Sequence, residues 1–185
     1  MDNKRQMRKL PSPAWLRRRL EYRNGQLFWK RRPRGDFVDE RSFKVWNSQN
    51  PGERAGSQMS NGYRIVGMLD SKFLEHRLIF QMELRALGEG ETVDHEDQNH
   101  RRNETANFRG CTHAKNLMNQ PGRRPGGLPK HVYWSELEKK YKVGMRADGN
   151  KHHIGTFKKL EEAAAAAMEA RIRLHGEFAD HRGSA

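Results

Sequence analysis

Cysteine is almost absent from the sequence, since Cys111 is the single one among 185 residues. A lone cysteine excludes an intramolecular disulfide and any zinc site built from several cysteines, so we expect no structural zinc. Long hydrophobic runs are also missing, and the sequence shows no signal-peptide core, which argues against a membrane-spanning or secreted protein. We therefore expect a soluble, cytoplasmic protein that binds no membrane.

Positive charge is what the sequence has in excess. The net charge is +13, the isoelectric point is near 10.2 and the mean hydropathy is −1.09. Residues 1–35 contain 12 Lys or Arg and only two acidic residues. A chain of this size has room for one or two small domains, and such charge favours nucleic acid as the partner because basic side chains neutralise phosphates.

The stretch from Asp94 to Asn119 contains four groups of polar residues in a characteristic order and spacing. Four groups carry the pattern: Asp94-His95, Asp97-Gln98-Asn99, Asn107-Phe108-Arg109 and Thr112-His113-Ala114-Lys115-Asn116-Leu117-Met118-Asn119. Hydrolysis of a phosphodiester requires a base for water, a cation held by oxygen ligands and a fixed geometry between them. The residues of this stretch are of the right kinds for all three.

This stretch resembles the HNH nucleases, and within that family the phage-type homing endonucleases. The resemblance implies a ββα-metal domain with one Mg²⁺ (or Mn²⁺) ion per active site, held by Asp94 and Asn116. It implies that His95 is the general base and that Asn107 holds the active-site loop and orients the His95 ring. Asn116 replaces the final histidine of the family pattern.

Each of these residues also has a simpler interpretation. Taken alone, Asp94-His95 is more typical of a turn, and Asn107 and Asn116 are more typical of surface or capping positions. We interpret His100 and His113 as facing solvent or phosphate, and His76 as packing or touching phosphate. Only the combined spacing of these residues along the sequence favours a nuclease site.

The residues before the motif predict a small mixed domain, and the resemblance covers residues 14–120. After a basic arm at 1–13, Ser12-Pro13 predicts a helix through Tyr22, in which Arg17 and Arg18 either contact phosphate or form a solvated face. The other expected elements are a strand at 26–30 after Asn24-Gly25, a loop at 31–60, a hairpin at 63–74 and a helix at 75–87 with Leu78, Ile79, Met82 and Ala86 on one face.

Proline and glycine mark a boundary after the motif. Residues 121–130 predict an extended linker, in which Arg123 and Arg124 would follow a groove or a phosphate ridge. Residues 131–180 then predict a second domain with strands at 131–134, 140–147 and 151–157, a turn at Asp148-Gly149 and a helix at 160–174 with Met168 and Ile172 facing inward, followed by a tail at 181–185.

The second domain is similar to the apetala-type (ethylene-response-factor) DNA-binding domain. The similarity lies in Val132-Tyr133-Trp134, Ile154-Gly155-Thr156-Phe157, Glu161-Glu162-Ala163-Ala164 and Leu174-His175-Gly176-Glu177-Phe178-Ala179. It implies a sheet that lies in the major groove. The positions that would contact DNA are Lys130, Tyr133, Lys140, Lys142, Arg146, Lys151 and His153. For any one of them, a merely exposed strand position is the alternative.

Together these patterns predict an α+β protein with a nuclease domain, an extended linker and a three-stranded antiparallel sheet packed on one helix. The expected function is that of a monomeric, phage-encoded, site-specific endonuclease that nicks double-stranded DNA in the cytoplasm of the bacterial host. A non-catalytic DNA-binding regulator is the alternative, and an RNA nuclease or RNA-binding factor is a further one.

Overall fold

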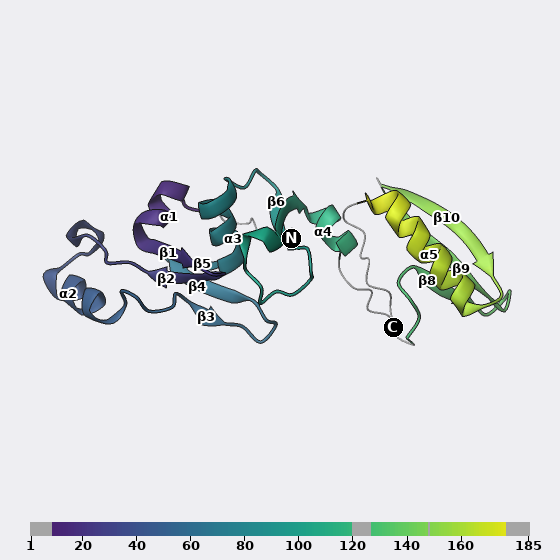
Figure 1. The fold of residues 1–185 in the computed structure, drawn as a ribbon, viewed down its shortest axis with the longest axis horizontal. Helices are drawn as coiled ribbons and strands as arrows, with labels where there is room; N and C mark the ends of the chain where they lie inside the picture. Colours follow the sequence, from purple (N-terminus) through teal and green to yellow (C-terminus); the bar gives the residue numbers. More distant parts are fainter. Residues whose placement is uncertain (1–8, 120–126, 148, 177–185) are drawn as a thin grey trace, which may run out of the picture. The chain divides into compact units, whose positions relative to one another are not determined.

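The computed structural model describes residues 9–119, 127–147 and 149–176. The chain divides into two compact units, Met1–Cys111 and Thr112–Ala185. It is of mixed α+β type, with several small antiparallel sheets and five α-helices among the described residues (Figure 1). Most of the expected linker, with Arg123 and Arg124, lies outside the described residues, as do most of the basic arm and the tail. Within the described ranges, no helix is long and apolar enough to cross a membrane.

The first unit consists of short elements. In chain order they are α1 (Pro13–Arg19), β1 (Leu20–Arg23), β2 (Gln26–Trp29), η1 (Arg34–Asp36), α2 (Glu40–Gln49), β3 (Ser57–Gln58), β4 (Arg64–Met68), β5 (Ser71–Leu74), α3 (Glu75–Ile79), η2 (Phe80–Leu84), β6 (Glu91–His95), η3 (Thr105–Asn107) and β7 (Phe108–Thr112). They form three sheets, β1–β2, β3–β4–β5 and β6–β7.

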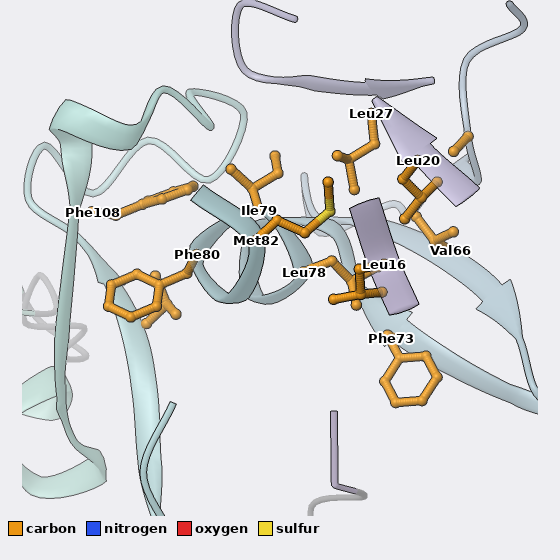
Figure 2. Packing of buried hydrophobic residues seen from close by; sticks show 12 residues of the cluster. Leu16, Leu20, Leu27, Val66, Phe73, Leu78, Ile79, Phe80, Met82 and Phe108 are labelled. Carbon is orange, nitrogen blue, oxygen red and sulfur yellow. The ribbon is translucent and has the colours of Figure 1, made fainter. Parts of the chain in front are cut away.

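One hydrophobic core holds these elements together, and α3 lies at its centre (Figure 2). Leu78 and Ile79 of α3 are fully buried, as are Leu16 of α1 and Leu27 of β2. Complete burial of one such side chain stabilises a fold by about 1.5–3 kcal/mol. The sheets are therefore fixed around α3, and the end of β6 is fixed with them.

The helix expected to run through Tyr22 ends earlier. Ser12 caps α1 as predicted, since its Oγ accepts from the Trp15 amide at 3.3 Å, but α1 ends at Arg19 and Leu20–Arg23 is strand β1. The reason is the Asn24-Gly25 turn, with φ angles of 45° and 77°. This turn pairs β2 with the segment before it, so that segment must be extended.

Two further expectations differ from the structure. The loop expected at 31–60 contains the helix α2, capped by Asp39, whose carboxylate accepts from the Ser42 amide at 2.7 Å. The helix expected at 75–87 has π-helical hydrogen bonding in η2 and ends at Leu84, which leaves Ala86 exposed outside the helix. Leu78, Ile79 and Met82 are buried as predicted.

The second unit contains the predicted sheet and helix. Its elements are α4 (His113–Asn119), β8 (Val132–Ser135), β9 (Lys140–Ala147), β10 (Asn150–Phe157) and α5 (Leu160–His175). The strand order is β10–β9–β8, and Figure 1 shows α5 lying along this sheet. Val132 and Val143 of the sheet form its core with two alanines of α5, Ala163 and Ala167.

The inward face of α5 differs from the expected one. Ala163, Ala167, Ala170 and Arg171 are buried, whereas Ile172 is 47% exposed. Small side chains let the helix approach the sheet closely, and at 3.6 residues per turn the row that starts at Ala163 continues through Ala167 to Ala170 and Arg171. The expectation that Ile172 faces inward was therefore wrong.

Candidate functional site

The residues of the expected nuclease site lie at one end of the sheet β6–β7. Asp94 and His95 are the last residues of β6, and Asn107 directly precedes β7. Backbone hydrogen bonding joins the two sides, since the Glu96 amide donates to the Asn107 carbonyl at 3.0 Å. The loop between the strands is thereby held closed at its base.

Asn107 holds this loop through its side chain. Its Nδ2 donates to Asp97 Oδ1 at 2.9 Å and to the Arg102 carbonyl at 2.9 Å, and its Oδ1 accepts from the Asp97 amide at 3.1 Å. Asp97 in turn accepts from the Asn99 amide at 2.8 Å and from Arg102 Nη1 at 2.8 Å. Asn107 thus has contacts suited to the loop-holding role expected of it.

The imidazole of His95, by contrast, is hydrogen-bonded to a different asparagine. His95 Nε2 lies 3.0 Å from Asn103 Oδ1, and Asn103 Nδ2 donates to Glu75 Oε2 at 3.1 Å. Glu75 also accepts from the Leu27 amide at 3.1 Å and lies 3.6 Å from Arg54 Nη2. The ring is therefore linked through Asn103 to the first residue of α3.

Aromatic rings surround His95. The ring of Phe108 lies 5.1 Å from it between centroids, His76 at 5.0 Å and His100 at 5.6 Å, while Tyr63 stacks on His100 at 4.2 Å. His95 is 3% exposed, and this burial lowers its pKa below the ordinary value. A lowered pKa keeps the imidazole neutral near pH 7, as a proton acceptor requires.

Asp94 is also buried, and it is paired with a cation of the protein. Its Oδ2 lies 2.7 Å from Arg109 Nε, the arginine of the predicted Asn-x-Arg step. A carboxylate is the oxygen donor that Mg²⁺ or Mn²⁺ prefers, so the chemistry of Asp94 suits a hard cation. The ion pair means that such a cation would share this carboxylate with Arg109.

Asn116, the other expected ligand, lies in α4. Thr112 caps this helix as expected, with its Oγ1 accepting from the Lys115 amide at 3.4 Å. Asn116 is half-buried and belongs to the second unit, whereas Asp94 belongs to the first. The described parts of the chain contain no group of three or more His, Cys, Asp or Glu that could hold a metal.

Among the expected DNA contacts outside the sheet, Arg17, Arg18 and Lys130 lie in the described residues. Arg17 and Arg18 are both exposed on α1, and the Arg17 guanidinium donates to the Met82 carbonyl. Lys130 is half-buried and donates to the Met118 carbonyl at 2.9 Å. Arg17 and Lys130 thus have structural contacts besides any contact with phosphate.

The sheet of the second unit brings the remaining expected contacts onto one face. Tyr133 is the partner of Lys142, and Arg146 is the partner of Lys151, so their side chains point to the same side. This side is opposite to the Val132–Val143 side, which packs on α5. It forms a groove of about 560 Å³ lined by His131, Tyr133, Lys142, Val143, Gly144, Met145, Arg146, Lys151 and His153. Lys140 lies two residues before Lys142 on the same strand, outside the groove, and Lys142 is paired with Glu138 at 2.5 Å.

Asn103 and Glu75 were not identified from the sequence. Asn103 lies between two groups of the motif but is not part of the pattern itself. Glu75 lies 28 positions before it. One signal was available: Glu75 starts the helix whose Leu78, Ile79 and Met82 are buried, and an acidic residue beside such a face requires a partner.

Comparison with known proteins assigns the chain to no family. No protein-family model matches the chain, and neither curated proteins nor solved structures give a significant match.

Proposed function

We propose that this protein is a metal-dependent endonuclease that nicks double-stranded DNA. The observation that carries the proposal is the arrangement at the end of β6, where a buried carboxylate, Asp94, precedes a buried neutral imidazole, His95, beside a loop tied down by Asn107. The HNH resemblance of residues 94–119 assigns these residue types to phosphodiester hydrolysis.

His95 is the proton acceptor in this proposal. Its neutral ring takes a proton from water, and the resulting hydroxide attacks phosphorus in line with the leaving 3′ oxygen. The HNH resemblance assigns one Mg²⁺ or Mn²⁺ to Asp94 and Asn116, and this cation would supply Lewis-acid stabilisation of the charge that develops on the phosphoryl and leaving oxygens.

The sheet of the second unit supplies the DNA contacts. Lys142, Arg146 and Lys151 lie on its open face, and the net charge of +13 favours phosphate as their ligand. Tyr133, 45% exposed on the same face, offers a ring and a hydroxyl to a groove. We infer that this face provides recognition while the first unit carries the proton acceptor His95.

A non-catalytic DNA-binding protein is the second candidate. The burial of His95 favours it, because a buried and hydrogen-bonded histidine is also what a purely structural role produces. In that case the basic face of the sheet would carry the whole function.

A plasmid-nicking assay separates the two. The wild-type protein with Mg²⁺ should convert supercoiled plasmid to open circles, and EDTA should stop the reaction. His95→Ala should slow nicking by about 10²–10⁴-fold, the usual contribution of a general base, and retain DNA affinity. Circular dichroism of the variant checks its fold. Wild-type protein that binds the plasmid but leaves it intact would support the non-catalytic candidate.

A further inference from the structure

A buried hydrogen-bonded series runs from His95 through Asn103 to Glu75, and the three side chains are 3%, 4% and 0% exposed. The two outer members come from distant elements, since His95 ends β6 and Glu75 starts α3. Solvent cannot readily exchange with bonds so deeply buried. The direction of each bond is therefore decided by the protein groups alone.

Glu75 determines how the Asn103 amide is turned. Burial raises the pKa of Glu75, whereas the Leu27 amide, Arg54, Arg64 and Asn103 act in the opposite direction. Arg54 Nη2 lies 3.6 Å from Oε2 and the Leu27 amide donates to Oε1 at 3.1 Å, so both oxygens of Glu75 face donors. An ionised carboxylate only accepts, so Asn103 presents Nδ2 to Glu75 and is left with Oδ1 facing His95.

The position of Asn103 is itself fixed by the β1–β2 turn. Gly25, with φ +77°, lies so close to the loop that a Cβ atom there would come within 3.2 Å of the Asn103 carbonyl carbon. Any side chain at this position would press against the loop. The turn thus supports the Asn103 backbone from one side while Glu75 holds its side chain from the other.

We infer that Asn103 and Glu75 are positioning residues that fix the tautomer of His95. Because Asn103 Oδ1 can only accept, His95 Nε2 carries the proton, and the basic lone pair of the ring lies on Nδ1. This inference rests on the proposed function for its catalytic consequence. The tautomer itself is a property of the free protein and does not depend on that function.

Glu75→Gln tests the inference because the substitution should exchange the donor and acceptor roles in both hydrogen bonds of the Asn103 side chain. The Leu27 amide still needs an acceptor, so the new glutamine offers its oxygen there and its NH₂ group to Asn103. Asn103 must then turn its amide, and Nδ2 faces the His95 ring. His95 Nε2 becomes an acceptor, and the ring proton moves to Nδ1.

The measurement is the ¹⁵N spectrum of the His95 ring at neutral pH, which distinguishes the protonated from the non-protonated nitrogen. We expect an Nε2–H tautomer in the wild type and an Nδ1–H tautomer in Glu75→Gln. Nicking at saturating DNA should fall by about 10²-fold or more, as expected when the base is lost, while DNA affinity stays unchanged. Glu91→Gln is the matched control, because Glu91 also accepts from a backbone amide and pairs with an arginine but has no described bond to Asn103.

Two results would overturn the inference: an Nδ1–H tautomer in the wild type, or an Nε2–H tautomer that persists in the folded variant. The wild-type spectrum alone decides the first, so the test stands even if Glu75→Gln does not fold. A reversed tautomer in a protein that never nicks DNA would instead support the positioning role and count against the proposed nuclease activity. The two proposals therefore fail separately.

Discussion

Arg109 Nε lies 2.7 Å from Asp94 Oδ2, and the two side chains are only 17% and 5% exposed. A carboxylate so deeply buried is tolerated only when a cation or several donors compensate its charge. Arg109 therefore does for Asp94 part of what a bound metal ion would do. In the proposed site, a divalent cation would share the Asp94 carboxylate with this guanidinium.

Arg109→Leu should reveal this relationship. Removal of the guanidinium leaves Asp94 buried without this partner, which typically destabilises a fold by about 3–5 kcal/mol. A divalent cation at Asp94 would compensate part of the loss, because binding to the folded state alone adds stability. Urea denaturation of the variant, with EDTA and then with Mg²⁺ or Mn²⁺, should show a larger metal-dependent gain than in the wild type.

Arg85→Leu is the control for that measurement. Arg85 lies at the same 2.7 Å from Glu91, but this pair is 51% and 26% exposed. Exposed pairs contribute about 0–1 kcal/mol, so the variant should lose little stability. Equal gains with metal in both variants would mean that Asp94 is not the residue that binds the cation.

The sequence predicted best those elements whose signals are local. Strand β9 spans the expected Lys140–Ala147, because apolar and polar residues alternate along it and the sequence Asp148-Gly149 predicts a turn after it. The Asn24-Gly25 turn was recognised, but the strand before it was not, since Leu16 and Leu20 also fit a helical spacing. Antiparallel pairing of this segment with β2, across the turn, makes it a strand.

Contacts between distant segments could not be predicted. Helix α2 was missed although Asp39 is a local capping signal, and no local spacing indicates the packing of its Trp46 on Trp29, 5.6 Å away between ring centroids. The bond between Asn103 and His95 was missed for the same reason as that between Asn103 and Glu75, since no local spacing signals it. The motif located the candidate site, but the fold decides which asparagine bonds to the ring.

The buried histidine His76 should make stability depend on pH. Burial holds its pKa well below the ordinary value, and His95, Arg77 and His100 act in the same direction, while Tyr63 and Phe108 contribute uncharged rings. The unfolded chain then binds more protons than the folded one between the two pKa values. The contribution of neutral His76 to the unfolding free energy is fully present above the pKa of the unfolded state, about 6.5. It is lost as pH falls towards the lower pKa of the folded state.

His76→Gln should therefore flatten the dependence of the unfolding free energy on pH below about 6.5, the ordinary histidine value. Urea denaturation at a series of pH values measures the slope. A residual slope is expected from His95 and His100, whose pKa values burial also lowers. His113→Gln, at an exposed position of α4, is the control and should retain the wild-type slope. An unchanged slope in His76→Gln would contradict the prediction.

The open face of the second sheet should control DNA affinity. Arg146 and Lys151 are strand partners and both are exposed. If each contacts a phosphate, the double variant Arg146→Ala/Lys151→Ala should lower the slope of log affinity against log salt by roughly two, about 0.9 per phosphate contact. Fluorescence anisotropy with duplex DNA at several salt concentrations measures this slope.

Lys159→Ala serves as the control for the sheet face. Lys159 is exposed at the N-cap of α5, the helix that covers the other side of the sheet. Its removal lowers the net charge without altering the open face, so the salt slope should stay close to the wild-type value. A comparable fall in both proteins would mean that affinity follows total charge rather than this face.

The two units should unfold separately, because the buried clusters that stabilise them share no residue. Val143 is fully buried in the second cluster between its strand partner Val132 and the alanines of α5. Val143→Ala removes two methyl groups and leaves a cavity, which should destabilise that unit by about 2 kcal/mol. Hydrogen exchange should then accelerate in β8, β9 and β10 and stay unchanged in α3.

Val66→Ala, at a fully buried position of β4, should give the reverse pattern. Its side chain belongs to the first cluster, around α3, so amides there should exchange faster while those of β9 keep the wild-type rate. If either substitution accelerated exchange in both units to the same extent, the chain would unfold as one cooperative body. A base in one unit and a DNA-binding face in the other could then not be varied independently, and the separation of chemistry from recognition would have to be abandoned.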